Sequence, residues 1–116
     1  MQMNEMKGLF DEVNASLGRF SKVFPKETGA FANFMHTVES PGELDAKQKE
    51  LISVALAVVK QCKWCIALHV KNALDRGASR KEIEEASWLA VLMGGGPALM
   101  YFQLVEKALD EFSASP

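Results

Sequence analysis

The spacing of apolar residues is the feature that most limits what this chain can fold into. Along most of the sequence apolar side chains recur at three- and four-residue steps, and no segment shows a sustained two-residue alternation. The first spacing gathers side chains on one face of an α-helix, whereas the second would gather them on one face of a β-strand. The pattern therefore predicts an all-α fold.

Helix-breaking residues divide this pattern into about six helices. Glycine or proline interrupts it at Pro25, Pro41-Gly42, Gly77 and the run from Gly94 to Pro97. The predicted helices cover residues 4–24, 26–39, 46–59, 62–76, 79–93 and 98–112. Because no long polar linker and no internal repeat divides the chain, we expect a single domain over residues 1–116.

The helix predicted over residues 46–59 has a clear start and an ambiguous interior. Asp45 is followed three residues later by Gln48, which is the spacing of a capping box. From Leu51 to Val59 every residue except Ser53 is apolar, which indicates a buried element. The many Val and Ala residues leave a buried strand as the alternative, but the cap and the length favour a helix.

Charge and hydropathy exclude several classes of partner. A formal net charge of −2 gives no electrostatic basis for binding nucleic acid or an anionic membrane. No apolar run approaches the roughly 20 residues that a membrane-spanning helix needs, and the N-terminus lacks the pattern of a secretory signal. We therefore expect a cytoplasmic protein with no nucleic-acid partner and no membrane partner. In that compartment a C-x-x-C pair is more often redox-active or metal-binding than a structural crosslink.

The segment C-x-x-C-x-x-x-H, formed by Cys62, Cys65 and His69, is the candidate for chemistry. A thiolate is the reactive form of cysteine, and a helix N-terminus stabilises it. If a helix begins near Cys62, both sulfurs lie in its first turn. Cys65 and His69 are then one turn apart on the same face, so the imidazole can accept the thiol proton. This is the arrangement of a nucleophile with its base.

A zinc site is the main alternative for the same residues. The two cysteines and His69 provide three ligands, and Glu50 or a second chain could add a fourth. The spacing is too compact for the usual zinc finger, and the chain has no other cysteine. We therefore predict a redox pair with no bound metal and no cofactor.

Glu50 is the candidate for an acid that orients His69, but its position depends on the course of the chain. No Gly or Pro interrupts residues 46–67, so the pattern by itself favours one continuous helix. Glu50 would then lie roughly 18 Å from Cys62 and out of reach. If the chain instead folds back near residues 60–62, Glu50 comes within one turn of His69. A relay Glu50–His69–Cys65 would then be possible.

Three segments resemble the alkyl hydroperoxidase D-like branch of the carboxymuconolactone decarboxylase family. They are D-A-K-Q-K-E-L-I at residues 45–52, C-x-x-C-x-x-x-H at residues 62–69 and G-A-S-x-x-E-I-x-E at residues 77–85. The resemblance implies an all-helical homotrimer or homohexamer with a central helical hairpin that carries the C-x-x-C pair. It also implies that Cys65 attacks peroxide, that Cys62 resolves the product, and that Glu50 and His69 form the proton relay. Trp64 departs from those members that have a second histidine inside the C-x-x-C.

The resemblance implies a thiol-dependent peroxidase or disulfide reductase. Its partners would be a peroxide substrate, an external dithiol or disulfide reductant, and further copies of the chain. The decarboxylase branch of the family lacks the cysteine pair, so lactone decarboxylation is a weaker alternative. A metal-binding or partner-binding helical oligomer without turnover is the other alternative.

Overall fold

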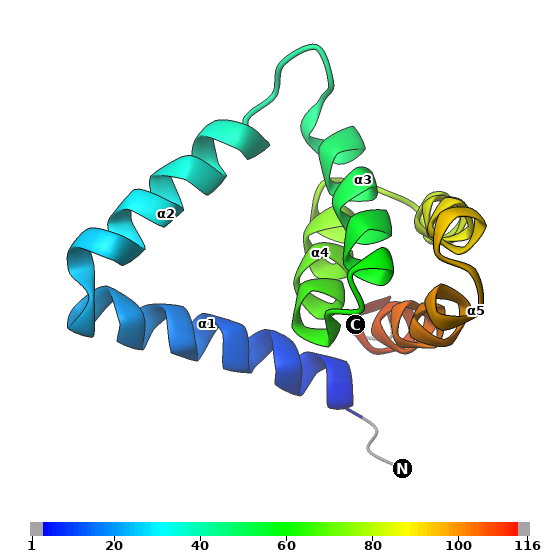
Figure 1. Ribbon diagram of the computed structural model, residues 1–116, viewed down its shortest axis with the longest axis horizontal. Helices are drawn as coiled ribbons and strands as arrows, with labels where there is room; N and C mark the ends of the chain where they lie inside the picture. The colour runs from blue at the N-terminus through cyan, green and yellow to red at the C-terminus, as the bar shows by residue number, and fades with distance from the viewer. Residues whose placement is uncertain (1–3, 114–116) are drawn as a thin grey trace.

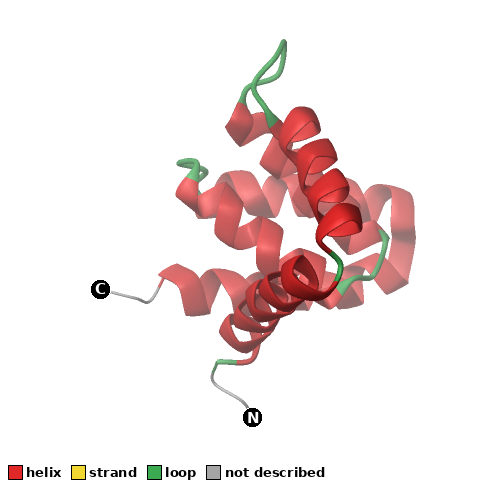
Figure 2. Ribbon diagram, turned by 90° about the vertical axis from the view of Figure 1, so that its left-hand side faces the viewer, coloured by secondary structure: helices red, strands yellow, loops and turns green. Residues whose placement is uncertain are grey.

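The computed structural model describes residues 4–113, and within that range it contains five helices and no strand. These are α1 (Glu5–Val23), α2 (Pro25–Glu39), α3 (Ala46–Val59), α4 (Lys63–Asp75) and α5 (Arg80–Ser113). Figure 2 shows the helices joined by short loops and turns. The prediction of an all-α fold is confirmed, and the strand alternative for residues 51–59 is wrong.

α3 begins where its cap predicts. The carboxylate of Asp45 accepts the backbone N–H of Gln48, and the Gln48 side chain accepts the backbone N–H of Asp45. This reciprocal pair satisfies two amides that would otherwise lack a partner at the helix start. The same arrangement between Ser79 and Glu82 starts α5.

The core lies where α3, α4 and α5 pack on one another (Figure 1). Its largest fully buried apolar side chains come from all three helices and from the start of α1, namely Met6, Val54, Val58, Ile66, Val70, Ile83, Val105 and Leu109. Burying a side chain of this size contributes about 1.5–3 kcal/mol relative to leaving it in water. This three-helix core therefore fixes α3 against α4.

The distal half of α1 and the whole of α2 extend away from this core. In Figure 1 they form two sides of an open triangle whose third side is α3. None of the residues of α2 is buried, and large apolar side chains on this α1–α2 arm are exposed, among them Phe20, Phe24, Phe31, Phe34 and Val38. The apolar stripe predicted on residues 4–24 reaches the core only at its N-terminal end.

The chain reverses between α3 and α4 without glycine or proline. Gln61 takes a left-handed conformation with φ of 56°. The N–H of Gln61 donates to the carbonyl of Val58, and the N–H of Cys62 donates to that of Ala57. This pair of bonds is a Schellman motif with Gln61 at the position that usually belongs to glycine. The fold-back near residues 60–62 is therefore confirmed, and the continuous helix that the pattern favoured is wrong.

α5 is interrupted in its middle. Gly95 has φ of 69° and ψ of −149°, and Pro97 follows two residues later. The break predicted at residues 94–97 is thus present, and counting the two arms of α5 separately gives the expected six helices. By length and composition alone α5 could span a membrane, because an 18-residue window within it has a mean hydropathy of 1.4. That evidence is weak, because α5 supplies Ile83, Val105 and Leu109 to the core.

Candidate active site

The hairpin of α3 and α4 brings Glu50 and His69 into direct contact. The Oε1 atom of Glu50 lies 2.8 Å from the Nδ1 atom of His69, although 19 residues separate them in the sequence. Glu50 is only 5% exposed, and its carboxylate is held on the side of α3 that faces α4. A carboxylate in this position accepts the Nδ1–H of the imidazole and leaves Nε2 as the basic nitrogen.

Cys62 and Cys65 occupy the N-terminus of α4 and form a disulfide. Cys62 is the N-cap residue, and its sulfur accepts the backbone N–H of Cys65 at 3.2 Å. The Cα atoms of the two residues are 5.2 Å apart, within the normal range for a disulfide. The same N-terminal amides and the helix dipole favour a thiolate when the pair is reduced.

A small cavity of about 230 Å³ lies over Cys65 and His69. Its lining is completed by Ser53, Leu56, Ala57 and Lys60 from α3 and its C-terminal end. Cys65 and His69, on one face of α4, therefore border the same space, together with Lys60. Lys60 was not predicted as part of the site, because its place in the lining of this cavity depends on the reversal at Gln61.

Glu39 is a second acid near the imidazole that the sequence does not identify. One carboxylate oxygen each from Glu39 and Glu50 and one ring nitrogen of His69 all lie within 4.8 Å of one another. Glu39 is the last residue of α2, two residues before the break at Pro41-Gly42. Nothing in the local sequence predicts its approach, because the path of residues 40–45 brings the end of α2 back to α3.

Trp64 lies between the two cysteines in sequence and faces outward. Its indole N–H donates to the Oε1 atom of Glu12 on α1 at 2.7 Å, and the side chain remains 42% exposed. The ammonium of Lys63 lies 4.8 Å from the centre of its ring. Trp64 thus connects the start of α4 to α1.

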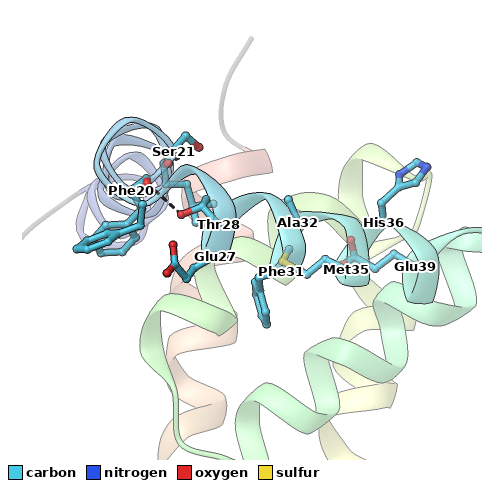
Figure 3. A pocket seen from close by; sticks show the side chains of 11 residues that line it. Phe20, Ser21, Glu27, Thr28, Phe31, Ala32, Met35, His36 and Glu39 are labelled. Atoms are coloured by element: carbon cyan, nitrogen blue, oxygen red, sulfur yellow. Dashed lines mark hydrogen bonds between the residues drawn. The ribbon is translucent and has the colours of Figure 1, made fainter.

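A larger cavity lies elsewhere, along the α1–α2 arm. It has a volume of about 550 Å³ and is lined mainly by apolar side chains, including Phe20, Phe24, Phe31 and Met35 (Figure 3). It shares no lining residue with the cavity at Cys65. His36 and Glu39 also border this cavity. The cavity at Cys65 is smaller, but it holds the groups that can do chemistry.

Comparison with known proteins places the chain among similar folds and sequences. Residues 25–106 match the sequence model of the carboxymuconolactone decarboxylase family. A member of that family from Legionella pneumophila, solved in its apo form, superposes with a TM-score of 0.86 at 36% identity, covering 96% of each chain. Another from Thermotoga maritima, for which a part in the antioxidative response has been suggested, gives 0.82 at 30% identity and 90% coverage of each. An uncharacterized protein of Cupriavidus necator is 37% identical over 110 residues, 95% of each chain.

Proposed function

This chain belongs to the carboxymuconolactone decarboxylase family, and we propose that it acts as a thiol-dependent peroxidase or disulfide reductase. The observation that carries the proposal is the contact between His69 and Glu50 beside the Cys62–Cys65 pair. An imidazole held by a buried carboxylate, next to a cysteine at a helix N-terminus, is the arrangement that activates a thiol. The suggested antioxidative part of the Thermotoga maritima relative agrees with this direction.

In the first step the Nε2 atom of His69 accepts the proton of the Cys65 thiol. The Cys65 thiolate attacks the terminal oxygen of a hydroperoxide, the O–O bond breaks, and Cys65 becomes a sulfenic acid. The leaving alkoxide takes the proton back from His69 and departs as an alcohol. Glu50 holds the ring in one tautomer and stabilises the positive charge that the imidazole carries between these two transfers.

In the second step the Cys62 sulfur attacks the sulfur of the Cys65 sulfenic acid. The S–O bond breaks, the S–S bond forms, and hydroxide leaves as water after it takes up the Cys62 proton. The Cys62–Cys65 disulfide is the product of this step. An external dithiol then reduces the disulfide by thiol exchange. The net reaction converts a hydroperoxide and a dithiol to an alcohol, water and a disulfide.

We further propose that the protein works as a homo-oligomer, a trimer or hexamer, in the reducing cytoplasm. Exposed apolar side chains support this proposal, because Leu92 and Met93 on α5 are 76% and 82% exposed and the α1–α2 arm presents several phenylalanines. Apolar patches of this kind mark contact surfaces between proteins. Light scattering tests the assembly, and a monomer at working concentration would contradict it.

The decisive experiment is titration of the reduced protein with hydroperoxide, followed by mass spectrometry of the peptide that contains residues 62–65. We expect one equivalent of peroxide to convert the dithiol to the disulfide. The Cys65→Ser variant should consume no peroxide. If that variant turned peroxide over at the wild-type rate, Cys65 would not be the reacting residue.

Two alternatives give different results in simple assays. Only the family name suggests lactone decarboxylation, and a direct assay with a carboxylated muconolactone tests this reaction. A helical oligomer that binds metal through its thiols without turnover would contain one zinc per chain when purified in the reduced state. Peroxide consumption that depends on Cys65 is expected of neither.

A further inference from the structure

We propose that Glu39, Glu50 and His69 form a binding site for a first-row divalent transition metal, with Zn²⁺ as the ion of reference. Each residue offers one ligand atom, and the three atoms lie within 4.8 Å of one another. They come from the last residue of α2, the first half of α3 and the middle of α4. The three ligands come from three separate helices, so it is the tertiary fold, and not their spacing in the sequence, that brings them together.

The distances suit a metal after a small adjustment. Zn²⁺ binds imidazole nitrogen and carboxylate oxygen at about 2.0–2.2 Å, so two ligands of one ion are at most about 4.4 Å apart. The pair formed by Glu50 and His69, at 2.8 Å, already fits a shared ion. Glu39 is only partly buried at a helix end, so a rotation of its side chain can shorten the remaining distances.

The two carboxylates and the helix end at the site favour a cation, whereas one nearby ammonium group opposes it. Glu50 is 5% exposed, so its carboxylate is largely removed from water. Glu39 stands at the C-terminus of α2, where the helix dipole is negative. The nearby ammonium of Lys49 donates to the carbonyls of Val38 and Ser40. Among residues 4–113, no ion pair joins Lys or Arg to either glutamate.

The donor set selects the class of metal. One imidazole with two carboxylates suits Zn²⁺, Mn²⁺ or Fe²⁺, whereas Ca²⁺ and Mg²⁺ prefer sites built entirely from oxygen. The two sulfurs are bonded to each other and cannot serve as ligands in this state. The proposed site therefore differs from a thiolate zinc site, because it includes Glu39 and is available in the oxidised protein.

A metal at this place would act on the proposed thiol chemistry, and this consequence alone rests on the proposed function. A metal bound at Nδ1 of His69 leaves the remaining ring proton on Nε2. His69 then cannot accept the proton of the Cys65 thiol. The metal-bound protein would therefore react with peroxide more slowly than the metal-free protein.

The binding test uses the full chain with its disulfide intact, so it does not depend on turnover. Chelator-treated protein is titrated with Zn²⁺ by calorimetry and with Co²⁺ by visible absorption. We expect one site per chain, with a Co²⁺ spectrum that lacks thiolate charge-transfer bands. The Glu39→Gln variant should bind about tenfold more weakly or worse. Glu43→Gln, a change at an exposed acid four residues away, is the matched control and should bind like the wild type.

Either of two results would overturn the proposal. One is no binding of Zn²⁺ to the wild-type protein at concentrations up to about 1 mM. The other is an affinity that Glu39→Gln leaves unchanged or that Glu43→Gln lowers equally. Peroxide turnover is measured separately, so an inactive protein that still binds Zn²⁺ through Glu39 would refute the proposed function and leave the metal site standing.

Discussion

The Nδ1 atom of His69 on α4 lies 2.8 Å from the Oε1 atom of Glu50 on α3, and the Glu50 carboxylate is almost wholly buried. Packing of two antiparallel helices holds this contact, so it is present before any substrate arrives. A buried acid that can interact with only one imidazole fixes the orientation and the tautomer of that ring. The contact therefore connects the folding of the hairpin to the reactivity of the cysteine pair.

Glu50→Gln tests this connection. The amide keeps the size of the side chain but removes the charge that stabilises a protonated His69. We expect the rate constant for oxidation of Cys65 by hydroperoxide to fall by about 10²-fold, the lower end of what a positioned acid–base group contributes. Stopped-flow fluorescence of the reduced protein measures this rate. Glu43→Gln is the control, and equal rates in the two variants would remove Glu50 from the relay.

The order of the two cysteines in the reaction has its own test. In Cys62→Ser the sulfenic acid formed on Cys65 has no thiol partner within the chain, so we expect it to accumulate. A dimedone adduct on Cys65, detected by mass spectrometry, measures it. In Cys65→Ser no adduct should form on Cys62 at the same peroxide dose. A strong adduct on Cys62 in that variant would reverse the proposed roles.

Much of the fold was predictable because local signals agreed with it. The cap at Asp45 and the break at Gly95 both lie where the sequence places them. The hairpin was not predictable from the pattern, since Gln61 adopts a conformation that glycine usually supplies. Gly77 occupies the same position in a Schellman motif at the end of α4, and there the glycine in the sequence predicts the turn.

The residues of the candidate site were also only partly predictable from the sequence. The motif identified Cys62, Cys65 and His69, because their spacing is local to one helix. Glu50 became a candidate only on the condition that the chain reverses. Glu39 was not identified from the sequence, because its approach to the imidazole depends on the path of a loop that belongs to no motif. Groups that tertiary packing brings together leave no periodic signal in the sequence.

Gln61→Gly should stabilise the protein. Gln61 has φ of 56°, a region that residues with a Cβ atom enter at a cost and glycine enters freely. The greater freedom of glycine in the unfolded chain offsets part of this gain, so we expect a net increase of about 0.5–1 kcal/mol. Thermal unfolding of the oxidised protein measures it. The opposite change at the matching position, Gly77→Ala with φ of 89°, should destabilise, and a loss of stability in Gln61→Gly would contradict the argument.

The kink in α5 offers a matched pair of glycines. A Cβ atom added at Gly94 would lie 2.8 Å from the Cβ atom of Ala98, whereas one added at Gly96 would meet nothing within 4 Å. Because neither Cβ atom can rotate away, Gly94→Ala must shift the backbone, and we expect a loss of about 1–3 kcal/mol. Gly96→Ala should change stability far less. Urea unfolding measures the stability of both variants. Equal losses of stability would mean that the kink tolerates the extra atom at Gly94.

The ion pair between Lys47 on α3 and Glu82 on α5 should make stability depend on pH. The hydrogen bond from the Ser79 backbone N–H and the contact with Lys47 lower the pKa of Glu82 below its ordinary value. A lowered folded-state pKa contributes stability above the unfolded pKa, and this contribution is lost as the pH falls through the folded-state pKa.

Glu82→Gln isolates this contribution, because glutamine can still complete the capping box but cannot pair with Lys47. The variant should be less stable than the wild type at neutral pH. Both side chains of the pair are partly exposed, so solvent screening keeps the difference small. The difference should shrink toward zero as the pH falls below the range where glutamate ionises. Urea unfolding at neutral and acidic pH measures it, with the exposed Glu85→Gln as control. A difference that stays the same at both pH values would show that Glu82 acts through its shape and not through its charge.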